Sequence, residues 1–213
     1  MARYAERSGE ALALTHQDKE ALLRQALQAI GRPLRKVLIL PPDFTRFNSN
    51  AGELTAILYR LLAPTAQVDI IPALGTHFAM TEKEIRAMFG PDIPLERFFE
   101  HDWRHGVKHL GEVPGSLIRE WSEGKVDYSV SVLTNRRLFD GYDLILSVGQ
   151  IVPHEVVGMA NYTKNIMVGV GGPDMINKSH FLGAVYNMER MMGRIDTPVR
   201  RLFNYGCETF LHD

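Results

Sequence analysis

The sequence predicts an α/β protein with a mostly parallel sheet, helices on both faces and a Rossmann-like order of elements. Short apolar runs typical of buried strands alternate along the chain with longer segments in which apolar residues recur at helical spacing. Glycine and proline mark several of the junctions between these segments. Because strands that are connected through helices pair in parallel, we expect residues 1–213 to form a single α/β domain.

The first part of the chain contains a capped helix and then two strand–helix units. Thr15 lies three residues before Asp18, which is the spacing of a capping box at the start of a helix. Thr81 and Glu84 repeat that spacing further along the chain. The predicted elements are a helix over 15–30, a strand over 36–40, a helix starting at 48–50, a strand over 67–71 and a helix starting at 81.

The pattern is less regular in the second part of the chain. We interpret the polar segment over 91–124 as an insertion or a small β-element. Beyond it, strict alternation of apolar and polar residues predicts a strand with one solvated face, whereas uninterrupted apolar runs predict strands that are buried on both faces. The predicted elements are a half-buried strand over 126–132, fully buried strands over 143–148 and 166–170, a helix starting at 173 and a helix over 199–211.

The charge balance and the cysteine content exclude several classes of protein. Lys and Arg total 24 against 25 Asp and Glu, a formal net charge of −1, which argues against the basic surface that nucleic-acid binding requires. Cys207 is the only cysteine, so neither an intramolecular disulfide nor a cysteine-rich metal site is expected. Residues 1–10 lack a signal-peptide core, and no apolar run approaches the roughly 20 residues of a membrane span. We therefore expect a cytoplasmic globular protein that binds neither nucleic acid nor membrane.

Residues that can carry chemistry follow the predicted strands. In parallel sheets, ligands gather beyond the carboxyl ends of the strands. The candidates at these positions are Asp43, Arg46, His77, His154, Gly171, Gly172 and His180, and Lys164 lies just before the predicted strand over 166–170. Their convergence is the strongest functional signal in the sequence. From it we predict that Arg46, His77, His154, Lys164 and His180 line one cleft.

His77 and His154 are candidates for acid-base catalysis. The pKa of histidine lies near neutrality, and Gly75 permits a tight turn that brings His77 to the edge of the sheet. Two histidines at neighbouring strand ends could flank a substrate and act as base and acid on its opposite faces. Either one alone is also consistent with a surface histidine that only forms hydrogen bonds.

A lysine, an ion pair and a glycine pair are further candidates. Lys164 precedes an apolar run, where partial removal from water would lower the pKa of its amine and make it nucleophilic; the alternative is a solvated lysine. Arg46 has the planar fork that binds a carboxylate, and Asp43 could hold a ribose hydroxyl or orient Arg46; the alternative is an ordinary ion pair. Gly171 and Gly172 precede a helix start and weakly suggest an anion site.

The remaining histidines are harder to interpret. His180 is followed one turn later by small residues, which leaves room for a bulky ligand, although a single histidine on a helix is usually structural. His101, His105 and His109 have the spacing of metal ligands on a helix. Gly106 argues against a regular helix there, so we interpret the trio as part of a solvated segment.

The order and spacing of the candidate residues resembles the nickel-dependent lactate racemase family, over roughly residues 36 to 192. The matching stretches are Asp43 to Arg46, Gly75 to His77, Pro153 with His154, Lys164, Gly171 with Gly172, and His180. The resemblance implies the N-terminal catalytic domain of that family. It also implies a nickel-pincer nucleotide, a pyridinium mononucleotide whose sulfur and carbon atoms chelate nickel.

The resemblance implies a role for each residue. Lys164 would bind the cofactor covalently through a thioamide, and His180 would complete the coordination of nickel. His77 and His154 would be the acid-base pair of a racemase or epimerase that transfers hydride from the 2-carbon of a 2-hydroxy acid and returns it to either face. The other implied contacts are Arg46 with the substrate carboxylate, Asp43 with the cofactor or substrate, and Gly171 and Gly172 with the cofactor.

Two features depart from the family. Residues 161–163 are Asn-Tyr-Thr where the family usually has glycines, and Phe78 follows His77 where an arginine is usual. Both positions border the site, so we expect a larger or differently charged 2-hydroxy acid than lactate. Family members also carry a C-terminal domain that closes over the site, and its absence here suggests a truncated protein or an isolated N-terminal domain.

Two other classes of function fit parts of the pattern. A domain of the same fold could bind a nucleotide or a sugar acid without turnover, and a histidine-metal hydrolase would also use clustered histidines. The racemase hypothesis implies a small-molecule 2-hydroxy acid and the cofactor-synthesis proteins as partners. An oligomer is compatible with each of these hypotheses.

Overall fold

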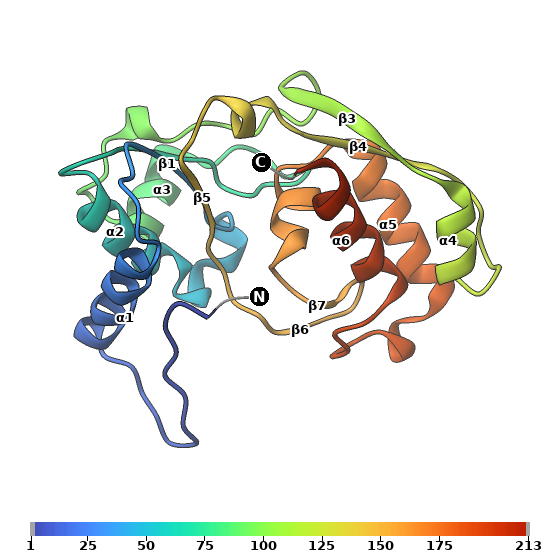
Figure 1. Cartoon of the computed structure of the whole chain (residues 1–213), viewed down its shortest axis with the longest axis horizontal. Helices are drawn as coiled ribbons and strands as arrows, with labels where there is room; N and C mark the ends of the chain where they lie inside the picture. The colour runs from blue at the N-terminus through green and yellow to red at the C-terminus, as the bar shows by residue number, and fades with distance from the viewer. Residues whose placement is uncertain (1–2, 212–213) are drawn as a thin grey trace.

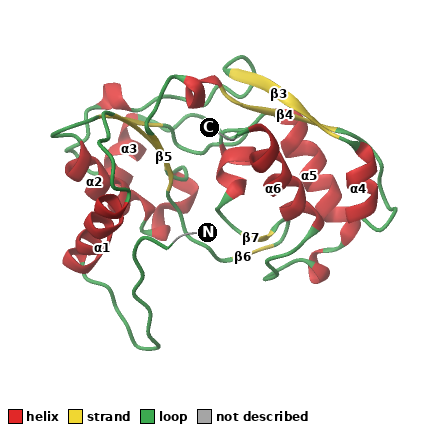
Figure 2. Ribbon diagram, viewed as in Figure 1, coloured by secondary structure: helices red, strands yellow, loops and turns green. Residues whose placement is uncertain are grey.

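The computed structural model describes residues 3–211 of the 213-residue chain (Figure 1). The elements form two groups, which lie at opposite sides of the view in Figure 1. One group holds a small parallel sheet with three helices, and the other holds an antiparallel strand pair with three later helices (Figure 2). The α/β class is therefore confirmed, although the parallel sheet is smaller than predicted. No helix within the described residues is long and apolar enough to cross a membrane.

The parallel sheet contains three of the strands predicted from the sequence, those over 36–40, 67–71 and 143–148. Their order across the sheet is β2 (Gln67–Ile70), β1 (Lys36–Leu40) and β5 (Leu144–Ser147). β1 lies in the centre, and its residues from Val37 to Leu40 are fully buried, as expected for an apolar strand covered on both faces. β5 is an edge strand and is only half-buried, which corrects the prediction of a fully buried strand there.

Three helices pack along one face of this sheet. They are α1 (His16–Ala29), α2 (Ala51–Leu62) and α3 (Glu82–Phe89). Both predicted capping boxes are confirmed: the Thr15 hydroxyl accepts a hydrogen bond from the N–H of Asp18, and the Thr81 hydroxyl accepts one from the N–H of Glu84. Each box satisfies N–H groups that the first turn of a helix leaves without partners.

The opposite face of the sheet is covered differently. Leu38 and Leu40 point away from the three helices and pack against Leu138 and Val170. Neither of these partners belongs to an α-helix, since Leu138 lies in a 3₁₀-helix and Val170 just follows a π-helix. The prediction of helices on both faces is thus corrected, because the chain covers this face with short irregular turns.

The second group has its own apolar core. β3 (Val107–Val113) and β4 (Val130–Asn135) pair in antiparallel fashion with a bulge at His109 and Gly111. The segment predicted as a small β-element therefore supplies β3, while the alternating strand begins later than predicted and continues to Asn135. The other strands and α-helices of this group are α4 (Gly115–Trp121), β6 (Pro153–His154), β7 (Gly158–Met159), α5 (Pro173–Tyr186) and α6 (Pro198–Phe210). Four 3₁₀-helices lie elsewhere within the described residues, namely η1 (Phe44–Ser49), η2 (Leu95–Arg97), η3 (Arg136–Phe139) and η5 (Met188–Arg190).

The predicted strand over 166–170 is wrong. This run forms a π-helix, η4 (Asn165–Gly169), in which the N–H of Val170 donates to the carbonyl of Asn165 over 3.1 Å. The run is buried, as predicted, but Met167 packs into the core of the second group while Val170 packs against the sheet. A short apolar run signals burial without distinguishing strand from helix, which explains the error.

Candidate active site

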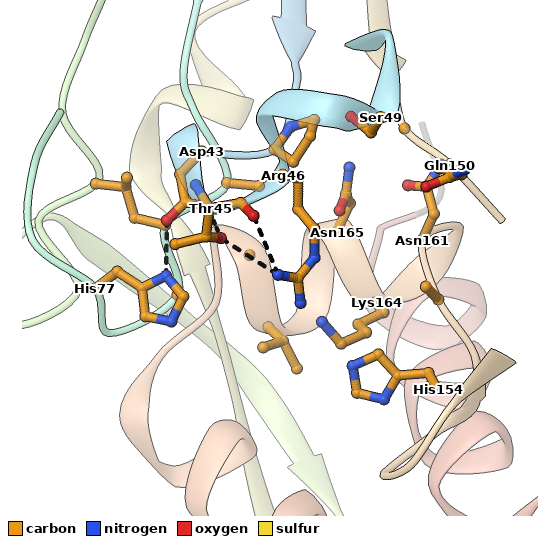
Figure 3. Close-up of a pocket in the computed structure, with 18 of the residues that line it drawn as sticks. Asp43, Thr45, Arg46, Ser49, His77, Gln150, His154, Asn161, Lys164 and Asn165 are labelled. Carbon is orange, nitrogen blue, oxygen red and sulfur yellow. Dashed lines mark hydrogen bonds and ion pairs between the residues drawn. The ribbon is translucent and has the colours of Figure 1, made fainter. Parts of the chain in front are cut away.

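A cleft of about 280 Å³ lies between the two groups of elements and is lined by residues from both. It contains six of the eight candidate residues, namely Asp43, Arg46, His77, His154, Lys164 and His180. Figure 3 shows Asp43, Arg46 and His77 entering from one side and His154 and Lys164 from the other. The loops after β1 and β2 bring the first three, and the segment after β5 brings the others, as expected at the carboxyl ends of parallel strands.

Asp43 is a buried carboxylate whose oxygens are already engaged. It caps η1 by accepting a hydrogen bond from the N–H of Thr45 at 3.2 Å, and it also accepts from the Thr45 hydroxyl. Its second oxygen lies 2.7 Å from Nδ1 of His77. Because a carboxylate only accepts, Nδ1 of His77 carries the proton that is shared in this contact.

The loop after β2 places His77 at the mouth of the cleft. Gly75 has φ of +60°, and its N–H donates to the carbonyl of Gly169 over 2.8 Å, which ties the loop to η4. The His77 side chain is 58% exposed. With Nδ1 donating to Asp43, the neutral ring has its lone pair on Nε2, so His77 is arranged to accept a proton.

His154 has the opposite arrangement. It is buried in the β6–β7 hairpin, and the N–H of Val156 donates to its Nδ1 over 3.0 Å. The neutral ring must then carry its proton on Nε2. Burial, together with the positive charge of Lys164, lowers the pKa of His154 to about 4. His154 is therefore a neutral hydrogen-bond donor in the resting structure.

Lys164 stands at the start of η4, with its amine between the guanidinium of Arg46 and the ring of His154 (Figure 3). Burial lowers the pKa of this lysine, and the nearby charge of Arg46 lowers it further. Both effects raise the share of neutral amine, which is the form that acts as a nucleophile.

Arg46 reaches into the same space. It lies on η1, is exposed, and contacts the carbonyl and hydroxyl of Thr45 only at the long distance of 3.5 Å. A planar fork in this position suits the carboxylate of a small acid. Glu155 adds a carboxylate at the rim, 3.6 Å from Nδ1 of His154, and sequence analysis missed it. Its position next to a candidate histidine was the only available signal.

His180 has the hydrogen bonding typical of a metal ligand. Its Nδ1 lies 2.6 Å from the carbonyl of Ile176, one turn earlier in α5, so Nδ1 carries a proton and Nε2 keeps its lone pair. Metal-binding histidines usually donate their second ring nitrogen in this way, because the bond fixes the tautomer and the orientation of the ring. His180 thus offers one nitrogen, Nε2, to the cleft as a ligand.

Gly171 and Gly172 lie outside the cleft lining. Both are buried, and a Cβ atom would stand 1.8 Å from the carbonyl oxygen of Met167 at Gly171 and 2.7 Å from Cβ of Leu133 at Gly172. Glycine at these positions is explained by close packing against η4 and β4. The structure does not bring this pair to the other six candidates.

The interpretation of the histidine trio as a solvated segment is corrected at His101. This residue is buried, its Nε2 lies 2.9 Å from the carbonyl of Gly171, and the amide of Asn135 donates to its Nδ1. Its two nitrogens are therefore used to hold the turn behind η4. His105 and His109 are exposed, and residues 3–211 contain no group of three or more His, Cys, Asp or Glu side chains placed to bind a metal ion.

Residues 5–193 match the profile of the family described as Lactate racemase N-terminal domain. The chain belongs to this family. It is 26% identical over 188 residues to the lactate racemase of Thermoanaerobacterium thermosaccharolyticum, which covers 85% of this chain and 41% of that protein. This chain therefore spans less than half of the length of that lactate racemase.

Solved structures show the same fold. A crystal structure of a Thermotoga maritima protein superposes with a TM-score of 0.82 at 24% identity, covering 92% of this chain and 47% of that one. The apoprotein of the T. thermosaccharolyticum lactate racemase superposes with a TM-score of 0.65 at 22% identity, covering 89% of this chain and 46% of the racemase. The lactate racemase N-terminal domain fold therefore extends over nearly all of this chain.

Proposed function

We propose that this chain is the cofactor-holding part of a racemase or epimerase that acts on a 2-hydroxy acid. The observation that carries the proposal is the meeting, in one cleft, of the desolvated Lys164, two histidines with complementary tautomers, and the guanidinium of Arg46. Membership of the lactate racemase N-terminal domain family supports it.

The cleft fits the nickel-pincer nucleotide that the family resemblance implies. Lys164 would hold it through its neutral amine, and Nε2 of His180 would be a ligand to nickel. When bound, this group supplies a hydride acceptor for the 2-carbon of the substrate. Asp43, which we expected at the cofactor or substrate, has its oxygens on Thr45 and His77, so we assign it to orienting His77.

The two histidines divide the proton transfers. Oxidation of a 2-hydroxy acid releases the hydroxyl proton, and Nε2 of His77 is the nitrogen arranged to accept it. Return of hydride to the carbonyl requires a proton donor, and His154 would give this proton from Nε2 in its imidazolium form and so return to the neutral ring seen here. Turnover in the reverse direction exchanges these roles, so racemisation needs both residues.

Substrate binding follows from the remaining charges. Arg46 would hold the substrate carboxylate with two parallel hydrogen bonds and so fix the 2-carbon relative to the histidines. Glu155 places a negative charge on the same cleft. This charge disfavours a second carboxylate near His154 and favours a substrate with a neutral or hydrogen-bond-donating group there.

Cofactor loading tests the proposal. The chain, produced together with cofactor-synthesis proteins, should gain the mass of the nucleotide, and Lys164→Ala should abolish the adduct while the exposed Lys125→Ala retains it. His180→Ala should keep the adduct but lose nickel, in contrast to His105→Ala. An adduct that persists in Lys164→Ala, or nickel that is retained equally by all variants, would contradict the assignment.

The acid-base roles need a second measurement. In a protein that carries both halves of the racemase, His77→Gln and His154→Gln should each retain the adduct and nickel yet lose exchange at the 2-carbon by about a hundredfold or more. A non-catalytic binding domain would show the adduct without exchange in any form. Full exchange in either histidine variant would remove that residue from the mechanism.

A further inference from the structure

Arg200 is a buried cation without an acidic partner. It lies on α6 with 5% of its surface exposed, and none of the ion pairs among residues 3–211 involves it. Removing a charge from water is costly unless its hydrogen bonds are replaced. Neutral groups of the protein must therefore supply the hydrogen bonds that Arg200 would otherwise make with water.

These contacts converge on the segment that carries Lys164. The guanidinium donates to the Thr163 hydroxyl at 2.7 Å, to the carbonyl of Asn161 at 3.3 Å from two nitrogens, and to the carbonyl of Met159. The Asn161 carbonyl also accepts from the N–H of Lys164 at 3.3 Å. The guanidinium of Arg200 thus donates hydrogen bonds to three acceptors in the segment just before Lys164.

α6 adds further bonds to the same segment. The Thr163 hydroxyl donates to the Asn204 side chain over 2.8 Å, and the Thr197 hydroxyl donates to the carbonyl of Val157 over 3.0 Å. Arg200 lies one turn from each of these partners on the helix. The helix therefore holds the chain from Val157 to Thr163 along one face.

The backbone of the segment that Arg200 binds is strained at Asn161 and Tyr162. Asn161 and Tyr162 both have φ of +59°, in the left-handed region that glycine adopts freely and bulky side chains adopt rarely. Two consecutive residues of this kind persist only if the surrounding structure enforces them. They stand immediately before Thr163 and Lys164, so any relaxation of the backbone there would move the lysine.

We propose that Arg200 is a positioning residue that holds the left-handed turn at Asn161 and Tyr162 and thereby aims Lys164 into the cleft. α6 lies beyond residues 5–193, which match the family profile, so this device is not part of that match. The consequence for catalysis rests on the proposed function, whereas the positioning itself can be measured on the chain without cofactor or substrate.

The test follows the reactivity of the Lys164 amine. Competitive acetylation over a range of pH, read by mass spectrometry, gives the pH at which this amine loses its proton. Arg200→Lys keeps the positive charge and removes the fork, so the loosened lysine should become more hydrated and its midpoint should rise by about one pH unit. Arg201→Lys is the matched control, because Arg201 is exposed and, within residues 3–211, forms an ion pair with Asp196 alone. Its midpoint should equal that of the unchanged chain.

A rescue separates positioning from general stability. Tyr162→Gly removes the side chain that resists positive φ, so the turn should need less support. In the Arg200→Lys background this change should lower the Lys164 midpoint again, although it removes a large side chain. The charge of Arg200 itself also lowers the pKa of Lys164, and Arg200→Lys keeps a positive charge at this position. The charges on Arg46, Glu155 and Asp43, which also act on Lys164, are the same in all these variants.

Each outcome decides the proposal. If Arg200→Lys matches Arg201→Lys, or if Tyr162→Gly leaves the raised midpoint unchanged, Arg200 does not position the lysine. If Arg200→Lys fails to fold, Thr163→Val replaces it, because this variant removes one acceptor of the guanidinium and keeps Arg200. Thr163→Val should raise the midpoint in the same direction by a smaller amount, and an unchanged midpoint would overturn the proposal. These results stand whether or not the chain carries the proposed cofactor.

Discussion

At the scale of single residues, the two cleft histidines differ because of neighbours that are close in the chain or in space. Asp43 fixes the proton of His77 on Nδ1, while the N–H of Val156 fixes that of His154 on Nε2. Identical side chains thus begin as acceptor and donor. The difference arises from one carboxylate and one backbone amide, and neither is visible from the histidine positions alone.

The depressed pKa of His154 predicts acid sensitivity. Its ordinary pKa of 6.5 falls to about 4 in the folded chain, so the unfolded chain binds more protons between these values. The free energy of unfolding must then decrease as the pH falls through this window, and the contribution is fully present only above 6.5. Urea unfolding at about pH 7 and about pH 4.5 should show that His154→Asn loses about 2 kcal/mol less than the unchanged chain.

The variants are chosen so that the proteins differ mainly in whether residue 154 can bind a proton. Asparagine can still accept the hydrogen bond from Val156, so packing changes little. Burial also lowers the pKa of His101, but that residue is present in both proteins and its effect cancels. The exposed His105→Asn is the control and should keep the acid sensitivity of the unchanged chain. Equal losses in all three proteins would show that His154 is not desolvated.

At the scale of elements, the sequence predicted correctly the features that depend on neighbouring residues and incorrectly those that depend on distant ones. The capping boxes at Thr15 and Thr81 are contained within four residues of sequence, and both predicted helix starts were confirmed. The run from Ile166 to Val170 was predicted as a strand but packs between two cores as a π-helix. Its conformation depends on partners far along the chain, which no short window reveals.

The packing of η4 predicts the cost of adding one methyl group. In Gly171→Ala the new Cβ would lie 1.8 Å from the carbonyl oxygen of Met167, a backbone atom that cannot move without disturbing the π-helix. The free energy of unfolding should fall by at least about 3 kcal/mol, even without any ligand. Gly9→Ala is the control, because its nearest contact at 3.6 Å is ordinary. Equal stability by urea unfolding would mean that Gly171 is kept for another reason, such as contact with a cofactor.

At the scale of the whole molecule, the sequence predicted a convergence of residues correctly and a sheet incorrectly. Asp43, Arg46 and His77 follow strands of the parallel sheet and meet the segment after β5 because the carboxyl ends of such strands lie at one edge. Lys164 and His180 reach the same cleft from the start of η4 and from α5. The pairing of β3 with β4 and the contributions of Arg200 and Glu155 were missed. Each depends on segments that are distant in sequence, and a single sequence carries no periodic signal for such contacts.

The segment 165–171 joins the two groups of elements, which predicts how they unfold. The Asn165 amide donates to the carbonyls of Leu40 and Val148, and the Val170 carbonyl accepts from the N–H of Asn135. Val170 is fully buried against the parallel sheet, while Met167 is buried in the other core. Because one short helix completes both cores, neither core is expected to remain folded when the other opens.

Hydrogen exchange of the native chain measures this coupling. Val170→Ala removes buried methyl groups and should lower the opening free energy of the most protected amides by about 2 kcal/mol in β1 and by an equal amount in α6. Ile195→Ala, at a side chain that is 82% exposed, should change neither element. If Val170→Ala lowered protection in β1 alone, the two groups would unfold separately. The cleft between them would then be a contact between two independently stable parts and not the product of one cooperative fold.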